Sequence, residues 1–213
     1  QLILQGTGAI EIKSGYGLSL DSELKILRVI KKLKENSKAT IKSTFLGAHA
    51  VPLEYKNNKS KYLDLILNEM LPAIESEGLA DYIDVFCEKG YFDVDDTIKV
   101  LKAGQKYALK GKTHVNQFNS IGGVKASIEN NCISVDHLEV MEEEDYLAFK
   151  NSSCIATLLP SCSFFLGIPY SPAKEFIKRN IPFNLASDYN PGSSPSGNMN
   201  FVSSLGSIKL KLN

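Results

Sequence analysis

The chain lacks the features by which several large classes of protein are recognised. No apolar run approaches the roughly 20 residues that a membrane-spanning helix requires. Its 24 lysine and arginine residues balance 24 aspartate and glutamate residues, so no excess charge favours nucleic acid or an anionic membrane surface as a partner. We therefore expect a protein that acts on a small-molecule substrate, without nucleic-acid or membrane partners.

Closely spaced cysteine pairs are also absent. The four cysteines are too far apart for a CxxC motif, and three of them lie in apolar, strand-like surroundings. Buried free thiols in a reducing cytosol are the simpler interpretation than a disulfide or a thiolate metal site. The prediction is a cytoplasmic protein. The cysteines are Cys87, Cys132, Cys154 and Cys162.

The two ends of the chain carry no processing signal. Residues 1–4 include no initiator methionine, no basic region and no small-residue cleavage site, so we do not expect a signal peptide there. Residues 207–213 stop without a closing signal. We expect the chain to be a fragment of a longer protein.

Short β-branched segments alternate with longer amphipathic segments. Residues 22–36, 62–77 and 94–107 place apolar side chains at helical spacing and charged side chains on the opposite face. Such alternation predicts an α/β protein made of right-handed βαβ units with a parallel sheet. The predicted strands cover residues 9–13, 40–46, 82–87, 112–115, 134–138, 155–159 and 183–187.

Two architectures fit such a sheet: an open doubly wound sheet and a (β/α)₈ barrel. A barrel builds its active site from the carboxyl ends of all strands, whereas an open sheet concentrates chemistry at one switch point, usually with a glycine-rich phosphate turn. No GxGxxG or P-loop motif occurs here. We predict one partial (β/α)₈ barrel domain over residues 1–213, with one strand missing. Polar groups at the predicted strand ends are Lys13, Ser14, His49, Glu88, His114, His137 and Asp188.

Only three histidines occur in the chain, and His49, His114 and His137 each follow an apolar run. A single histidine in such a place is usually a packed core residue, but three at strand ends, with Asp188 at a fourth, indicate one shared site. Imidazoles with one carboxylate suit a borderline divalent ion such as Zn²⁺ or Fe²⁺. The same groups could act as acids and bases without a metal, because histidine titrates near neutrality.

A glycine-flanked turn follows the first predicted strand. Gly15 and Gly17 lie on either side of Tyr16, within residues 11–18. Such a loop can place a phenol against a substrate, and the alternative is a plain structural turn.

Two carboxylates at strand ends each allow more than one role. Asp188 is followed by Gly192 and Ser193, whose backbone N–H groups could bind an anion, although a turn or cap role is the alternative. Glu88 is either a ligand or substrate contact, or a surface carboxylate. The acidic residues 142–145 are typical of a solvated helix start.

Five segments in order along the chain resemble the imidazolonepropionase family: EIKSGYGL (11–18), FLGAHAVP (45–52), DVFCE (84–88), DHL (136–138) and DYNPGS (188–193). The resemblance covers essentially the whole chain. It implies the amidohydrolase superfamily, whose members are (β/α)₈ barrels, and a mononuclear Zn²⁺ or Fe³⁺ site. The implied activity is hydrolysis of 4-imidazolone-5-propanoate to N-formimidoyl-L-glutamate in histidine degradation.

The superfamily's metal ligands are a His-x-His pair on the first strand, a histidine on the fifth and an aspartate on the eighth. Counting back from Asp188 as strand eight places His137 on strand six, His114 on strand five and Lys13 on strand two. The missing strand is then the first. The resemblance implies that His114 and Asp188 bind the metal, that Asp188 is the catalytic base, and that His137 polarises the scissile carbonyl.

The resemblance also implies a set of substrate contacts and some absent parts. An arginine that binds the propionate, and a small β-sandwich domain formed by the termini, would lie outside the chain; the full-length enzyme would be a homodimer. Asn116, two residues after His114, stands where the family usually has aspartate, which affects a hydrogen bond near the metal site and not a metal ligand. The implied substrate contacts are Tyr16, His49, Gln117, Asn190, Gly192 and Ser193.

Two alternatives stay open. One is another amidohydrolase, such as a guanine deaminase or a dihydroorotase-like enzyme, against which the segment 11–18 argues. The other is an inactive barrel fragment, because a metal centre without two of its four ligands loses affinity.

Overall fold

A computed structural model describes residues 1–212 and contains one parallel sheet of seven strands. The strands lie in chain order, and each pairs in parallel with the next. All seven predicted strands are confirmed, with ends that differ by at most two residues. Their bounds are β1 (Ala9–Lys13), β2 (Thr40–Ala48), β3 (Tyr82–Cys87), β4 (Lys110–Val115), β5 (Ser134–His137), β6 (Ile155–Leu158) and β7 (Phe183–Leu185).

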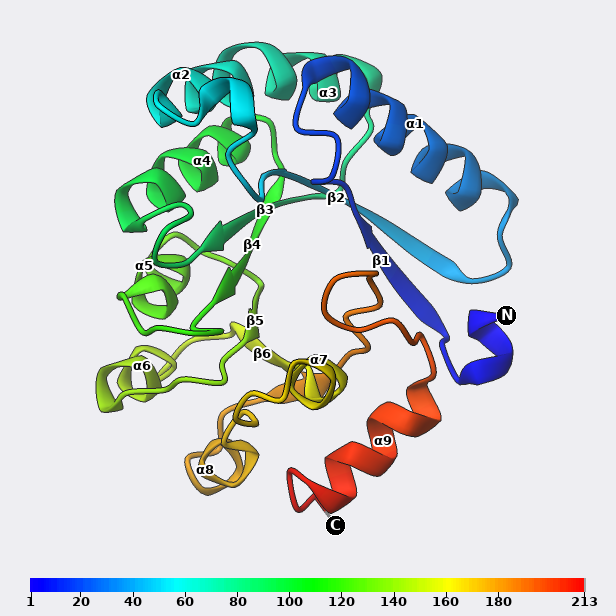
Figure 1. The fold of residues 1–213 in the computed structure, drawn as a ribbon, viewed down its shortest axis with the longest axis vertical. Coiled ribbons are helices and arrows are strands. Elements are labelled where there is room, and N and C mark those ends of the chain that lie inside the picture. The colour runs from blue at the N-terminus through cyan, green and yellow to red at the C-terminus, as the bar shows by residue number, and fades with distance from the viewer. Residues whose placement is uncertain (213) are drawn as a thin grey trace.

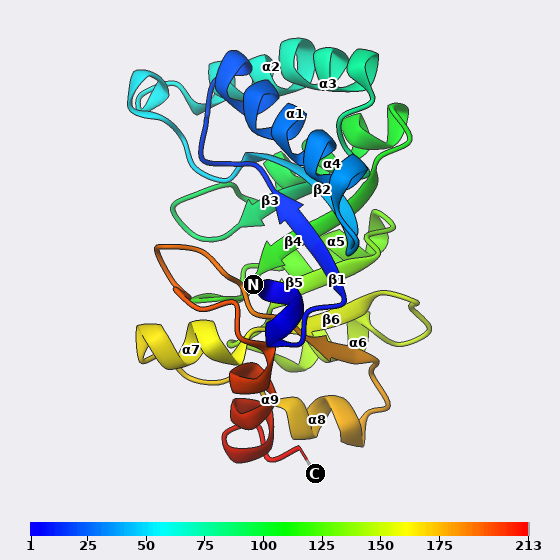
Figure 2. The same cartoon turned by 90° about the vertical axis from the view of Figure 1, so that its right-hand side faces the viewer.

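The sheet is curled, with helices on its outer face (Figure 1). Strands β1 and β7 form its two edges, and no pairing between them closes the sheet within residues 1–212. The loops that follow β2, β3 and β7 lie on the same side of the sheet (Figure 2). The architecture is therefore α/β with a curled parallel sheet, and its seven strands do not by themselves make a closed barrel.

The helices agree with the predicted amphipathic segments where those were strongest. The segment predicted as one helix over 62–77 begins earlier and contains a π-helical turn, η3, between α2 and α3. The helices are α1 (Leu20–Asn36), α2 (Lys59–Leu65), η3 (Ile66–Met70), α3 (Leu71–Glu77), α4 (Val94–Lys106), α5 (Gly123–Glu129), α6 (Glu143–Ala148), α7 (Pro160–Leu166), α8 (Ala173–Lys178) and α9 (Met199–Ile208), with short 3₁₀ turns η1 (Leu2–Gln5) and η2 (Leu53–Tyr55).

Capping side chains explain where two of these helices begin. Asp93 accepts a hydrogen bond from the backbone of Asp96, and the Asp96 side chain accepts one from the backbone of Asp93, which is a capping box at the start of α4. Glu142 and Asp145 form the same arrangement at α6. The acidic residues 142–145 thus begin a helix, as predicted, and Asp93 and Asp96 begin another.

The main core lies between the outer face of the sheet and the helices. On α1, Leu24, Leu27 and Ile30 are buried, whereas Leu33, which has the same periodicity, is 48% exposed. The last six residues of α1 are all exposed, which explains that difference. All four cysteines are buried and free, as predicted. Among the described residues, no helix is long and apolar enough to cross a bilayer.

Leu27→Ala is expected to lower the free energy of unfolding by about 2–5 kcal/mol, because it leaves a cavity under α1. Leu33→Ala on the same helix should change it by less than about 0.5 kcal/mol, since that side chain is already exposed. Urea denaturation followed by circular dichroism measures both values. Equal losses would contradict this description of the core.

Candidate metal and substrate site

Three histidines meet near the carboxyl ends of the strands. His114 lies in β4, His137 ends β5, and His49 follows β2. The ring centroids of His114 and His137 are 5.3 Å apart. The Phe86 ring, on β3, has its centroid 6.2 Å from those of both His49 and His114. The structure therefore connects three histidines that are far apart in the sequence, His49 to His114 across the Phe86 ring and His114 directly to His137.

Each of these histidines faces an oxygen through its Nδ1 atom. In His49, Nδ1 lies 2.9 Å from the carbonyl oxygen of Gly15, and in His114 it lies 3.1 Å from Asp84 Oδ1. A carbonyl oxygen can only accept, so His49 carries a proton on Nδ1. In neutral His49 this leaves Nε2 as the atom with a free lone pair.

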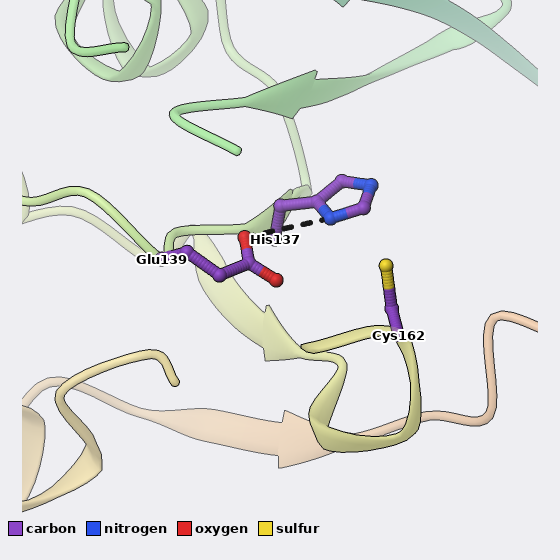
Figure 3. A group of neighbouring side chains, drawn as sticks. All are labelled: His137, Glu139 and Cys162. Carbon is purple, nitrogen blue, oxygen red and sulfur yellow. Dashed lines mark ion pairs between the residues drawn. The ribbon is translucent and has the colours of Figure 1, made fainter. Parts of the chain in front are cut away.

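His137 has a looser version of the same arrangement (Figure 3). Its Nδ1 is 3.5 Å from Glu139 Oε2, a distance of an ion pair rather than a hydrogen bond, and both atoms are buried without another partner. Burial alone would lower the pKa of His137, but contacts with Cys162 and Glu139 and the charge of Asp188 raise it well above its usual value. His137 is therefore suited to remain protonated at neutral pH.

Burial determines the direction of the pKa shift at His49, whereas nearby charges determine it at Asp84. The pKa of His49 is lowered, chiefly because burial disfavours its charged form. Burial would raise the pKa of Asp84, but the nearby charges of His114 and Lys13 outweigh it and hold that pKa well below its usual range. Asp84 is thus an ionised carboxylate in contact with His114.

Asp188 follows β7 in a loop that its own polar neighbours close. Its Oδ2 accepts a hydrogen bond of 3.0 Å from the Ser193 hydroxyl. The backbone N–H groups of Gly192 and Ser193 donate to Asn190 Oδ1, at 2.9 and 2.8 Å. Those two groups, predicted to be available to an anion, are therefore engaged within the loop, and a ligand would have to displace the Asn190 oxygen.

The charge of Asp188 raises the pKa of two residues in different parts of the site. It contributes to the raised pKa of Tyr16, after the larger effect of burial, and to the raised pKa of His137. Tyr16 makes an edge-on contact with His49, with centroids 5.3 Å apart. Segments that precede and follow most of the sheet thus contribute to one site.

The residues after His114 have structural partners. Asn116 Nδ2 donates to Asp145 Oδ2 at 2.8 Å, so the amide, which departs from the family's aspartate, supplies a donor where a second carboxylate would face Asp145. Gln117 is buried, with Nε2 3.5 Å from Cys162 Sγ. The departure at Asn116 therefore concerns its bond to Asp145 on α6.

Glu88 is buried, and both of its carboxylate oxygens accept hydrogen bonds from the chain. It is 1% exposed, and its Oε2 accepts from the backbone N–H groups of Phe118, at 2.9 Å, and Asn119, at 3.3 Å. The Asn119 side chain donates to Oε1 at 3.0 Å. Glu88 therefore ties the end of β3 to the loop after β4, and the prediction that it could be a surface carboxylate is wrong.

Sequence reasoning missed Glu23, which holds the Tyr16 loop. This fully buried residue of α1 accepts backbone hydrogen bonds from Gly15 at 3.1 and 3.0 Å, from Gly17 at 2.8 Å and from Leu18 at 3.0 Å. The same turn presents the Gly15 carbonyl to His49. The only signal in the sequence is an acidic residue in the first turn of an amphipathic helix.

Two groups of three side chains have atoms that could bind a metal ion close together. In the first, Asp84 and Asp136 lie beside His114, but the Lys13 ammonium is 2.7 Å from Asp84 Oδ2 and 3.3 Å from Asp136 Oδ2, so a cationic group already lies between them. The second consists of His137, Glu139 and Cys162, all buried (Figure 3).

His114 and Asp188, the metal ligands predicted from the family resemblance, carry side chains that can bind a metal ion. His114 has its Nδ1 on Asp84, the arrangement that leaves Nε2 for an ion, and Asp188 offers a carboxylate. Imidazole nitrogens and carboxylate oxygens are both zinc ligands in proteins. His114 and Asp188 are of suitable types to act as two of the ligands, and the groups of three or more ligating side chains within residues 1–212 include His114 but not Asp188.

Comparison with known sequences gives a match along the whole chain. No protein-family model matches. An imidazolonepropionase from Christiangramia forsetii is 59% identical over 97% of the chain, and one from Alkaliphilus metalliredigens is 40% identical over 100% of it. The chain spans about half the length of these curated relatives, 50% in both cases. The predicted resemblance to imidazolonepropionases is confirmed.

Solved structures with similar folds are more distant in sequence. A guanine deaminase from C. acetobutylicum with bound guanine has a TM-score of 0.73 at 15% identity, over 99% of the chain and 54% of its own. An amidohydrolase from a Sargasso Sea sample has a TM-score of 0.67 at 11% identity, over 99% of the chain and 51% of its own. An adenosine deaminase from Xanthomonas campestris with bound zinc has a TM-score of 0.66 at 10% identity, over 98% of the chain and 48% of its own. These likenesses show an amidohydrolase-type fold.

Glu23→Ala should lower the free energy of unfolding by about 3 kcal/mol or more, because it removes the charged acceptor of several buried N–H groups. Glu35→Ala, at an exposed position of the same helix, should change it by less than about 0.5 kcal/mol. Urea denaturation measures both. A loss at Glu23 no larger than at Glu35 would rule out its role in the loop.

Proposed function

We propose that the protein containing this chain is an imidazolonepropionase, which hydrolyses 4-imidazolone-5-propanoate to N-formimidoyl-L-glutamate in histidine degradation. The observation that carries the proposal is the gathering of all three histidines near the carboxyl ends of the strands, in a sequence up to 59% identical to imidazolonepropionases. A planar cyclic amide suits this site, whose rings include Tyr16, His49 and Phe86.

The same proposal extends to the architecture. The curled sheet would be part of a closed (β/α)₈ barrel in which one further strand lies between β7 and β1. Support comes from the two unpaired edges within residues 1–212 and from the coverage of about half of each larger neighbour. A barrel places its active site at the carboxyl ends of the strands, where His114 and His137 lie.

His114 and Asp188 would hold one metal ion, either zinc or iron. Such an ion supplies Lewis acidity, which polarises a carbonyl group and makes water a better nucleophile. The adenosine deaminase of similar fold is described with zinc. Iron stays equally open, because imidazole and carboxylate ligands suit both metals.

The chain's own residues then have separate tasks. The Asp188 carboxylate, with one oxygen held by Ser193, accepts a proton from the attacking water and passes it to the ring nitrogen as the C–N bond breaks. Protonated His137 donates to the carbonyl oxygen as negative charge develops there, an effect worth several kcal/mol in a preorganised site.

The remaining predicted contacts hold the substrate. Tyr16 and His49, fixed against each other and against the Gly15 carbonyl, would orient the planar ring. Gln117 and the loop that contains Asn190, Gly192 and Ser193 would contact its polar groups, after release of the internal bonds to Asn190. We further propose that the full-length enzyme is a cytoplasmic homodimer, as the family resemblance implies, and the four buried free thiols suit a reducing compartment.

Asp188→Ala should lower kcat by about 10³-fold or more, because it removes both the proton acceptor and a metal ligand. Tyr16→Phe should lower kcat/KM by less than about tenfold, since it removes at most one hydrogen bond to substrate. Steady-state hydrolysis of 4-imidazolone-5-propanoate by the purified protein gives both numbers. Small and equal losses would refute the assigned roles.

Treatment with a chelator should abolish hydrolysis, and addition of zinc or iron should restore it, because the proposed centre requires one ion. The same protein should leave guanine unchanged. Turnover of guanine without turnover of the imidazolone would contradict the proposal and indicate a deaminase.

A further inference from the structure

A partly buried ionic network contacts His114 through Asp84. The Lys13 ammonium is 2.6 Å from Glu11, 2.7 Å from Asp84 and 3.3 Å from Asp136. The Asp84 side chain is completely buried, and its two oxygens have different partners: Oδ2 contacts Lys13, while Oδ1 contacts Nδ1 of His114. Asp84 therefore connects the lysine of β1 to the histidine of β4.

The donors and acceptors in this connection can be arranged in only one way. A lysine ammonium has donors and no acceptor, so Asp84 Oδ2 must accept from it. An ionised carboxylate has no donor, so a proton must lie on Nδ1 of His114. When His114 is neutral, the ring nitrogen with a lone pair available to a metal is then Nε2.

We propose that Lys13 and Asp84 are positioning residues that select the tautomer of His114, holding its proton on Nδ1 so that Nε2 is the metal-binding atom. The inference rests on the proposed function, because it takes His114 as a metal ligand. It goes beyond that function by giving Lys13 a role other than charge balance. The Lys13 ammonium determines which atom of the side chain at position 84 faces His114.

Asp84→Asn exposes this role, because an amide cannot accept on both sides. Its oxygen must face Lys13, since an NH₂ group against an ammonium would leave two donors in contact. The NH₂ group then points at Nδ1 of His114 and requires a lone pair there. The ring proton moves to Nε2, which blocks the metal-binding atom.

Removal of the lysine should reverse the effect. When Lys13→Met is combined with Asp84→Asn, the amide oxygen at position 84 is free to turn toward His114 and accept the Nδ1 proton again. Lys112 remains 3.0 Å from Glu11 and 3.7 Å from Asp136, so those carboxylates keep a cationic partner. The double variant should therefore bind metal more tightly than Asp84→Asn alone, an outcome that simple loss of a buried ion pair does not give.

The test measures zinc affinity by chelator competition in the purified protein and its variants. Asp84→Asn should weaken zinc binding by roughly 10- to 100-fold, and Lys13→Met combined with Asp84→Asn should recover at least about half of that loss on a logarithmic scale. Glu88→Gln is the matched control, because Glu88 is a buried carboxylate just beyond the same strand that does not contact His114. Its affinity should stay within about threefold of the parent protein.

A second readout can be made first on the parent protein, without any substitution. Two-bond ¹H–¹⁵N spectra of zinc-free parent protein, at a pH where His114 is neutral, should show its proton on Nδ1. A proton on Nε2 would overturn the proposal. In Asp84→Asn the same spectrum should show the opposite tautomer.

His114→Ala separates failure of this proposal from failure of the proposed function. If His114→Ala abolishes zinc binding but Asp84→Asn does not weaken it, the tautomer proposal is wrong while the metal site stands. If the double variant binds no better than Asp84→Asn, Lys13 does not control the orientation. If His114→Ala binds zinc normally, the metal assignment and the tautomer proposal both fail.

Discussion

The register of three central strands is the constraint on which the site depends. In the pairing of β3 with β4, Phe86 lies opposite His114, and in the pairing of β4 with β5, His114 lies opposite Asp136. Side chains alternate between the two faces of a strand, so a slip of one residue would turn His114 away from Asp84 and toward the helices. The burial of apolar residues under the helices fixes that register, and the chemistry at the strand ends follows from it.

The charged interior is the costly part of this arrangement. Three carboxylates, Glu11, Asp84 and Asp136, face two ammonium groups, Lys13 and Lys112. Buried charges are tolerated only when they are paired and hydrogen-bonded. Burial would raise the pKa of Asp136, but the two lysines lower it to about 2, so this carboxylate stays ionised. The surplus negative charge lies next to His114, which favours a cation near that histidine.

Much of the scaffold could be predicted from sequence because its signals are local. The strands are short β-branched runs, the capping box at Asp93 lies within four residues, and each histidine lies in or just after a strand. The carboxylates were harder, because their roles depend on backbone that returns from elsewhere. Glu88 accepts from a loop 30 residues later, and Glu23 folds the Tyr16 turn around itself.

Two further contacts in the site join residues that are also far apart in the sequence. Asn116 pairs with Asp145, 29 residues away, and Lys13, expected only as a polar strand end, lies against Asp84, 71 residues away. Neither contact leaves a pattern in the sequence near the residue itself. Periodicity indicates which residues reach the site, but the three-dimensional register determines which atoms of each side chain remain available.

The central claim is that one metal ion is held through Nε2 of His114 and the carboxylate of Asp188. An anomalous difference map from crystals of the zinc-loaded protein tests it directly. The account predicts a zinc peak about 2.1 Å from both of those ligand atoms, with Nδ1 of His114 still on Asp84. A peak among His137, Glu139 and Cys162 instead, with none at His114, would contradict it.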